Sequence, residues 1–115
     1  YKMSLNLYKI ATQELCNSKG WSENTILETW LLFTEEVGEL ATCIRKHKNL
    51  YHNPKQFHKT EEELGDVFSY LFQIASMLDI DLDKVWSNHY KKSLRKRYSK
   101  PNNFLQNHTH ETYSR

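Results

Sequence analysis

The sequence predicts an all-α protein, an antiparallel four-helix bundle that assembles into an oligomer. Apolar residues recur every three or four positions over long stretches, which is the period of a helix with one buried face. We identify no strand signal in the 115 residues. A chain of this length buries only a modest core by itself, and so we expect copies of it to associate.

Residues 4–18 are predicted to form the first helix. Gly20 is suited to end it, because glycine adopts the left-handed conformation without strain. A long second helix is expected to begin at Thr25, since Thr25 and Glu28 have the spacing of a capping box. The apolar seam of this helix advances in alternating steps of four and three residues. It consists of Ile26, Trp30, Phe33, Val37, Leu40 and Ile44.

The third helix has two possible starts. Thr60 and Glu63 have capping-box spacing, which would leave residues 49–59 as a loop or a short ordered segment. The alternative start is near Pro54, because proline is favoured in the first turn of a helix.

The fourth helix is expected to follow a tight connection at residues 79–81, with Asp81 as its N-cap. We expect it to run to about Tyr98. The prediction is therefore one domain over residues 1–98, followed by a polar C-terminal tail over residues 99–115 that shows no helical period.

Composition excludes several classes of protein. The formal net charge is only +2, which implies no particular partner. Cys16 and Cys43 are too few for a disulfide framework and suit a reducing compartment. No apolar run approaches the roughly 20 residues of a membrane span, and residues 1–4 do not resemble a signal peptide. We therefore expect a cytoplasmic or otherwise intracellular protein with no membrane partner.

Four acidic residues form two pairs at a spacing of three: Glu36 with Glu39, and Glu63 with Asp66. Three residues nearly complete a helical turn, so each pair lies on one face of its helix. Two facing helices would gather these carboxylates into a small volume, which is costly unless a cation compensates the charge. Oxygen ligands suit Mg²⁺, with Mn²⁺ as an alternative, and such ions commonly partner phosphates.

Spacing alone leaves the ligand set open, because Glu35 with Glu39 and Glu62 with Asp66 also share a face. Each pair of acids encloses a glycine, Gly38 or Gly65. Glycine inside a helix costs about 1 kcal/mol against alanine. We therefore expect the two backbones to approach closely at these positions.

The motif Glu35-Glu36-x-x-Glu39 followed by Glu63-x-x-Asp66 resembles the signature of the MazG-like, all-α NTP pyrophosphatases. The resemblance extends over residues 4–98 and implies the bundle fold of that family. It implies that Glu36, Glu39, Glu63 and Asp66 hold the metal. It leaves Glu35 as a contributor to water activation beside Glu36.

The contacts with a nucleotide are predicted less directly. Trp21 stands where the family places an aromatic residue that stacks on the base, and Tyr70, one turn beyond Asp66, would touch ribose or base. Gln13 on the first helix would read a base edge. Lys92 and Arg95 share a face in the basic end of the fourth helix and are our candidates for phosphate contacts.

The activity implied by the resemblance is hydrolysis of a nucleoside triphosphate between its α- and β-phosphates, giving a monophosphate and pyrophosphate. We expect a homodimer or homotetramer that removes non-standard or surplus (d)NTPs. Two alternatives remain: a dUTP or phosphoribosyl-ATP pyrophosphatase on the same scaffold, or a non-catalytic module that binds nucleic acid through the basic fourth helix. A binding module has no need of four clustered acids, so nucleic acid is not an expected partner. A ferritin-like di-iron site is excluded, because its Glu-x-x-His pairs are missing.

Overall fold

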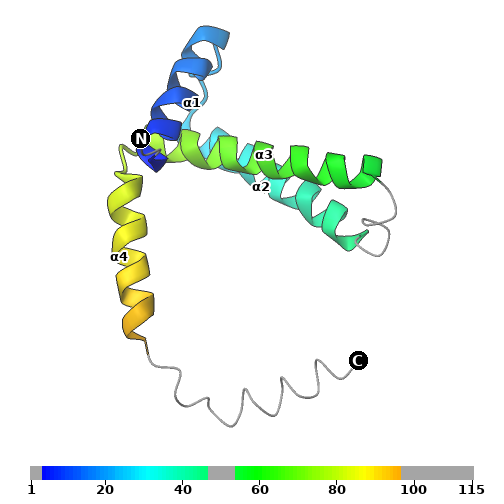
Figure 1. Cartoon of the computed structure of the whole chain (residues 1–115). Coiled ribbons are helices and arrows are strands. Elements are labelled where there is room, and N and C mark those ends of the chain that lie inside the picture. The colour runs from blue at the N-terminus through cyan, green and yellow to red at the C-terminus, as the bar shows by residue number, and fades with distance from the viewer. Residues whose placement is uncertain (1–3, 47–53, 97–115) are drawn as a thin grey trace. The chain divides into compact units, whose positions relative to one another are not determined.

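The computed structural model describes residues 4–46 and 54–96, and the regular elements of this part of the chain are all helices (Figure 1). They are α1 (Leu5–Lys19), α2 (Ile26–Arg45), α3 (Pro54–Met77) and α4 (Leu82–Arg95). The all-α prediction is confirmed for these described residues. None of their helices combines the length and the apolar character that crossing a bilayer requires.

The ends of α1 follow the sequence prediction. The Ser4 side chain accepts a hydrogen bond from the Leu7 N–H and so caps the first turn. Gly20 ends the helix in the left-handed conformation, with φ at 73°. The N–H of the next residue, Trp21, then donates to the Cys16 carbonyl at 2.8 Å, which is the bond of a Schellman motif. This cap fixes the backbone at Trp21, directly after the helix.

The start of α2 is the predicted capping box. The Thr25 hydroxyl accepts from the Glu28 N–H at 3.1 Å, and the Glu28 carboxylate accepts from the Thr25 N–H at 2.8 Å. One turn later Thr29 is almost fully buried, and its hydroxyl donates to the Thr25 carbonyl at 3.0 Å. The polar group that the chain buries here is therefore satisfied.

The third helix begins at Pro54, so the start at Thr60 is wrong and the alternative is confirmed. Thr60 lies inside α3, where its hydroxyl donates to the Gln56 carbonyl at 2.9 Å. Proline at the first position of a helix has no N–H to leave unpaired and its φ already suits the helix. The helix therefore starts about 1.7 turns before Thr60.

The helix α3 ends at Met77, and the chain turns at Asp79, which has a positive φ of 54°. The Ile80 N–H donates to the Ala75 carbonyl at 2.9 Å and closes the helix. At the start of α4, the Leu82 N–H donates to the Asn6 side chain at 2.8 Å, and the Asp81 carboxylate accepts from the Asn6 amide at 2.9 Å. These bonds join Asn6, in the first turn of α1, to residues 81 and 82.

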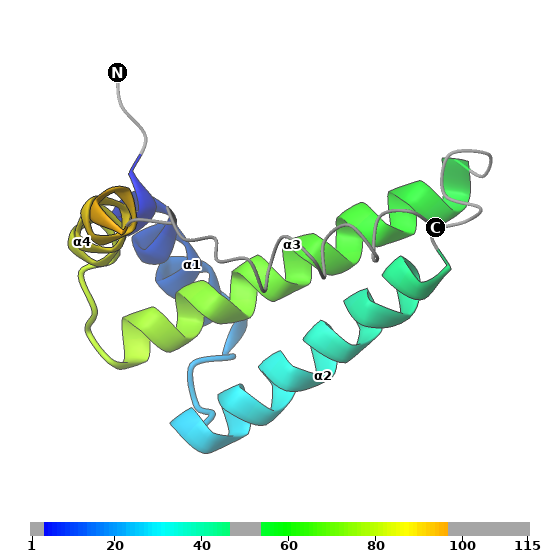
Figure 2. The ribbon, with the colours of Figure 1, turned by 90° about the horizontal axis from the view of Figure 1, so that it is seen from below.

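The helices α2 and α3 lie side by side and antiparallel, in both views of the ribbon (Figures 1 and 2). The helix α1 packs against the C-terminal half of α3, where the rings of Tyr8 and Phe72 lie 6.0 Å apart. Several apolar residues of the α2 seam remain about half exposed in the single chain, Trp30 at 50% and Ile44 at 52% among them. The oligomer expected from the sequence stays a prediction.

The chain divides into two compact units, residues 1–83 and 84–115. In the second unit α4 runs to Arg95, and the ring of Trp86 lies 5.8 Å from that of His89. The helix thus ends about three residues before its predicted end near Tyr98. Tyr98 itself and the tail over 99–115 fall outside the described residues. The four helices are therefore confirmed as elements, whereas their assembly into a four-helix bundle stays a prediction.

Candidate active site

Three carboxylates meet between α2 and α3. One carboxylate oxygen from each of Glu36, Glu39 and Glu63 lies within 4.8 Å of the other two. The three-residue spacing places Glu36 and Glu39 on one face of α2, and antiparallel packing brings Glu63 of α3 opposite them. Asp66, one turn along α3 from Glu63, lines an adjoining cavity together with Glu36.

Two oxygens of this cluster are buried and lack hydrogen-bond partners among the described residues. They are the Oε2 atoms of Glu36 and Glu63. Burial raises the pKa of Glu36 from 4.5 to about 7, and the charges of Glu39 and Asp66 add to the effect. Burial also raises the pKa of Glu63, and its closeness to Glu39 raises it further. The cluster therefore needs protons or a cation to be stable at neutral pH.

This donor set fits a hard divalent cation. Carboxylate oxygens are the ligands that Mg²⁺ and Mn²⁺ prefer. Two of the oxygens are already withdrawn from water and have no hydrogen-bond partner among the described residues, so a cation would satisfy them. Glu36, Glu39 and Glu63 are the residues that would hold it, with Asp66 beside them.

The glycines beside these acids do not have the role expected from the sequence. A Cβ built on Gly38 or on Gly65 would meet no atom within 4 Å. Gly38 lies about 200° around the helix from Glu36, so it points away from the face that meets α3. The backbones therefore do not need glycine in order to approach at these positions, and the expectation of a close approach is wrong for the single chain.

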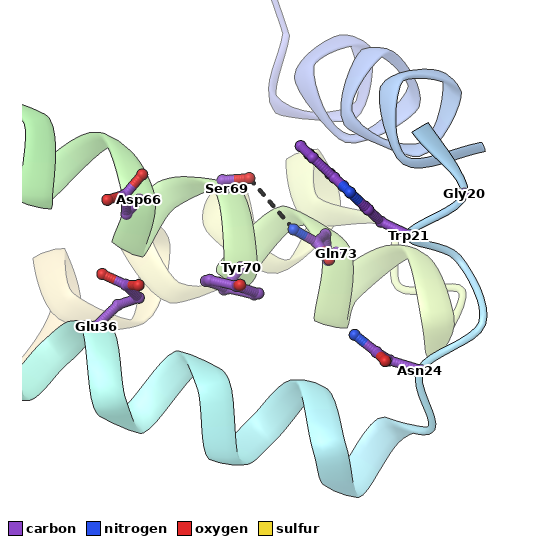
Figure 3. A pocket seen from close by; sticks show the side chains of 8 residues that line it. All are labelled: Gly20, Trp21, Asn24, Glu36, Asp66, Ser69, Tyr70 and Gln73. Atoms are coloured by element: carbon purple, nitrogen blue, oxygen red, sulfur yellow. Dashed lines mark hydrogen bonds between the residues drawn. The ribbon is translucent and has the colours of Figure 1, made fainter. Parts of the chain in front are cut away.

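A cavity of about 380 Å³ opens beside the carboxylates (Figure 3). It is lined by Gly20, Trp21, Asn24, Glu36, Asp66, Ser69, Tyr70 and Gln73. In the close view Glu36 and Asp66 stand at one end, Trp21 and Asn24 at the other, and Tyr70 between them. A pocket of this volume, with acids at one end and an aromatic ring at the other, suits a small ligand that carries both a charged and a flat part.

Tyr70 connects the two ends of this cavity. Burial raises the pKa of its hydroxyl, and the nearby charges of Glu36, Asp66 and Glu35 raise it further. The phenol therefore stays protonated at neutral pH and can donate a hydrogen bond to a ligand. Glu35 itself is exposed on α2 and does not belong to the group of three carboxylates.

Gln13 lines a smaller cavity of about 40 Å³, to which Trp21 and Gln73 also contribute. Both ends of its amide are engaged. The nitrogen donates to the Asn17 side chain at 3.1 Å, and the oxygen accepts from the Ser76 hydroxyl. The structure thus places Gln13 near the cavity of Figure 3 but not among the residues that line it.

Lys92 and Arg95 lie in the last turn of α4, in the second unit of the chain. Their predicted contact with phosphate stays a prediction.

Several residues that the sequence reasoning did not select also line the cavities. Ser69 and Gln73 lie three and seven residues after Asp66, on the same face of α3, and helical spacing alone would have found them. The Gln73 amide donates to the Ser69 hydroxyl at 3.3 Å. Asn24 comes from the turn between α1 and α2, where no periodic signal exists.

A second cavity, of about 250 Å³, lies against the other members of the carboxylate cluster. It is lined by Glu39, Thr42, Cys43, Lys46, Gln56, Lys59 and Glu63. Lys46 and Lys59 were not selected from the sequence. Lys59 lies one turn before Glu63, and Lys46 lies two turns after Glu39. Helical spacing would therefore have identified both lysines in the sequence.

Comparison with known proteins gives one match. The family described as "MazG nucleotide pyrophosphohydrolase domain" matches residues 24–100, more than half of the chain. The matched range includes the four acids and Tyr70, whereas Gln13 and Trp21 lie before it. No curated protein and no solved structure shows significant similarity to the chain.

Proposed function

Because the chain belongs to the MazG nucleotide pyrophosphohydrolase domain family, we propose that it hydrolyses nucleoside triphosphates between the α- and β-phosphates in a Mg²⁺-dependent reaction. The products are a nucleoside monophosphate and pyrophosphate. The observation that carries this proposal is the group of three carboxylates with two unpartnered buried oxygens, placed at the end of a cavity of nucleoside size.

The cation would be held by Glu36, Glu39 and Glu63, with Asp66 beside them. When bound, Mg²⁺ supplies positive charge that offsets the charge of the phosphates and acidifies water. We assign Mg²⁺ as the physiological ion and Mn²⁺ as a substitute, since both accept oxygen ligands.

The chain's own residues position the nucleotide. The indole of Trp21 offers a flat face for a base at the end of the cavity remote from the acids (Figure 3). The protonated hydroxyl of Tyr70 lies between base and acids, where it would donate to ribose or to the α-phosphate. Asn24 and Gln73 add amide groups that can pair with polar atoms of the nucleoside.

The reaction needs one bond made and one broken. The oxygen of a water molecule attacks the α-phosphorus, the bond from this phosphorus to the bridging oxygen breaks, and pyrophosphate leaves with the electron pair. The proton of the water passes to a carboxylate. Glu36, which lines the cavity, and Glu35 on the same turn of α2 are our candidates for this acceptor.

The substrate class that we propose is the non-standard or surplus (d)NTPs, with dUTP and phosphoribosyl-ATP as alternatives on the same scaffold. A homodimer or homotetramer would carry out this reaction. The half-exposed apolar seam of α2 supports association but does not choose between the two assemblies.

The test is pyrophosphate release from a panel of NTPs, dNTPs, dUTP and phosphoribosyl-ATP, with Mg²⁺ or with EDTA. Two neighbouring acids give a matched pair of variants. Glu63→Gln removes a member of the cluster and should lower Mg²⁺-dependent release more than about 100-fold, since even the outer partners of metal ligands contribute 10- to 100-fold. Glu62→Gln should leave it unchanged, because Glu62 is exposed and contacts His58 at 2.8 Å.

The same panel identifies the preferred nucleotide. Release from no nucleotide by the folded wild-type protein would overturn the proposed function. A salt-sensitive affinity for nucleic acid that survives Glu39→Gln would then favour the non-catalytic module.

A further inference from the structure

The carboxylate cluster lies between two cavities of different character. Glu36 and Asp66 line the larger one, and Glu39 and Glu63 line the smaller one. This division follows from the antiparallel packing of α2 and α3. Because the helices are antiparallel, the residues that follow Glu39 on α2 lie beside those that precede Glu63 on α3. Both segments are at the end of the cluster opposite to Tyr70. A substrate bound at the cluster therefore has one cavity on each side.

The two cavities differ in charge. The larger one is lined by aromatic and neutral polar residues besides its two acids, and no lysine or arginine is among its lining residues. The smaller one carries Lys46 and Lys59. Both lysines are exposed, and neither makes an ion pair with any acidic group among the described residues. Two positively charged side chains thus line the cavity on one side of the cluster, and neither forms an ion pair with a described residue.

The positions of these lysines suit a ligand that extends from the cluster. At a rise of about 1.5 Å per residue, Lys59 lies about 6 Å along the helix from Glu63, and Lys46 lies about 10 Å from Glu39. A lysine ammonium ion is a compact charge on a flexible stem with three donors, and it is a common partner of phosphate. The ammonium groups can therefore meet phosphates that lie just beyond the carboxylates.

We propose that Lys46 and Lys59 form the subsite for the β- and γ-phosphates, the part of the substrate that leaves as pyrophosphate. This inference rests on the proposed function and gives the substrate a direction: the nucleoside occupies the cavity with Trp21, the α-phosphate lies at the carboxylates, and the leaving group points toward the C-terminal end of α2 and the N-terminal half of α3. It adds a second basic site to the one predicted from the sequence at Lys92 and Arg95.

The direct test uses inorganic pyrophosphate as the probe, titrated calorimetrically into the full chain in the presence of Mg²⁺. The double variant Lys46→Gln with Lys59→Gln should bind pyrophosphate at least about tenfold more weakly than the wild type. It should bind a nucleoside monophosphate as the wild type does. Lys55→Gln is the matched control, because Lys55 is an exposed lysine on the same helix that does not line the cavity.

A complementary variant acts on the other end of the substrate. Trp21→Ala should weaken the binding of the monophosphate and leave pyrophosphate binding unchanged. In turnover, the double lysine variant should raise KM for the best triphosphate of the panel at least about tenfold, with its helical circular dichroism retained because both side chains are exposed.

Each result bears on a different claim. Wild-type binding of pyrophosphate by the double lysine variant, or an unchanged KM, would overturn the subsite while leaving the proposed function intact. A lysine pair that only offsets the charge of the carboxylates would instead change the affinity for Mg²⁺ and not that for pyrophosphate, which also overturns the subsite. Absence of pyrophosphate release by the wild type on every nucleotide would remove the proposed function, and the subsite with it.

Discussion

Replacing Glu36 by glutamine should make the metal-free protein more stable at neutral pH. The folded protein raises the pKa of this carboxyl from 4.5 to about 7, so between these values the folded state binds the proton more tightly than the unfolded chain. Stability is therefore lost as the pH rises from about 4.5 through about 7. Glu36→Gln removes the charge and with it this loss.

The size of the effect follows from the same values. Each pH unit between the folded and unfolded pKa corresponds to about 1.4 kcal/mol, which sets an upper value of about 3 kcal/mol for the rise from 4.5 to about 7. Glu36 is only partly buried and its neighbours titrate together with it, so we expect roughly 2 kcal/mol. For a domain of this size that is an increase in Tm of about 8 °C.

The assay is thermal unfolding followed by circular dichroism, on EDTA-treated protein from pH 4.5 to pH 8. The Tm of Glu36→Gln should exceed that of the wild type at pH 8 and equal it at pH 4.5. Added Mg²⁺ should raise the Tm of the wild type at pH 8 and leave the variant unchanged, because binding to the folded state stabilises it. Glu35→Gln changes the same charge on an exposed neighbour and should not raise the Tm.

A variant that is no more stable than the wild type at pH 8 would refute the reasoning. It would mean that the buried oxygen of Glu36 has a partner outside the described residues, and that the charge of Glu36 does not destabilise the folded state. An equal gain in Glu35→Gln would show instead that the general charge of α2 is responsible.

Three further changes test how the chain positions the cavity. Gly20→Ala should lower the free energy of unfolding by about 1 kcal/mol, because a Cβ is strained at φ 73°, and should weaken nucleotide binding by moving Trp21; an unchanged denaturation midpoint would contradict it. Thr25→Ala should lower the free energy of unfolding by about 1 kcal/mol, measured by urea denaturation, because it breaks the capping box. The activity at saturating Mg²⁺ should be retained. Asp79→Gly should stabilise the protein by several tenths of a kcal/mol, since glycine takes the positive φ of 54° without strain; a lower Tm would show that the Asp79 side chain has a role of its own.

The local features of this protein can be predicted from its sequence because they depend on residues close together in the chain. The cap at Gly20, the capping box at Thr25 and Glu28, and the three-residue spacing of the acids all follow from backbone geometry that a helix fixes by itself. The family resemblance rests on the same local pattern, and the match over residues 24–100 confirms it.

Where two local signals competed, the sequence could not decide. The capping pattern at Thr60 and the proline at position 54 each suited a helix start, and the helix begins at the earlier one. The intervening residues have no strong helix breaker, so once proline nucleates the turn the helix continues through Thr60.

The tertiary structure decided which faces meet. Only the packing of α2 on α3 shows that three carboxylates lie within 4.8 Å of one another, that Gly38 and Gly65 face open space, and that Lys46 and Lys59 line a cavity at the cluster. Spacing along one helix tells which residues share a face, but the partner of that face depends on side-chain packing between segments far apart in the sequence.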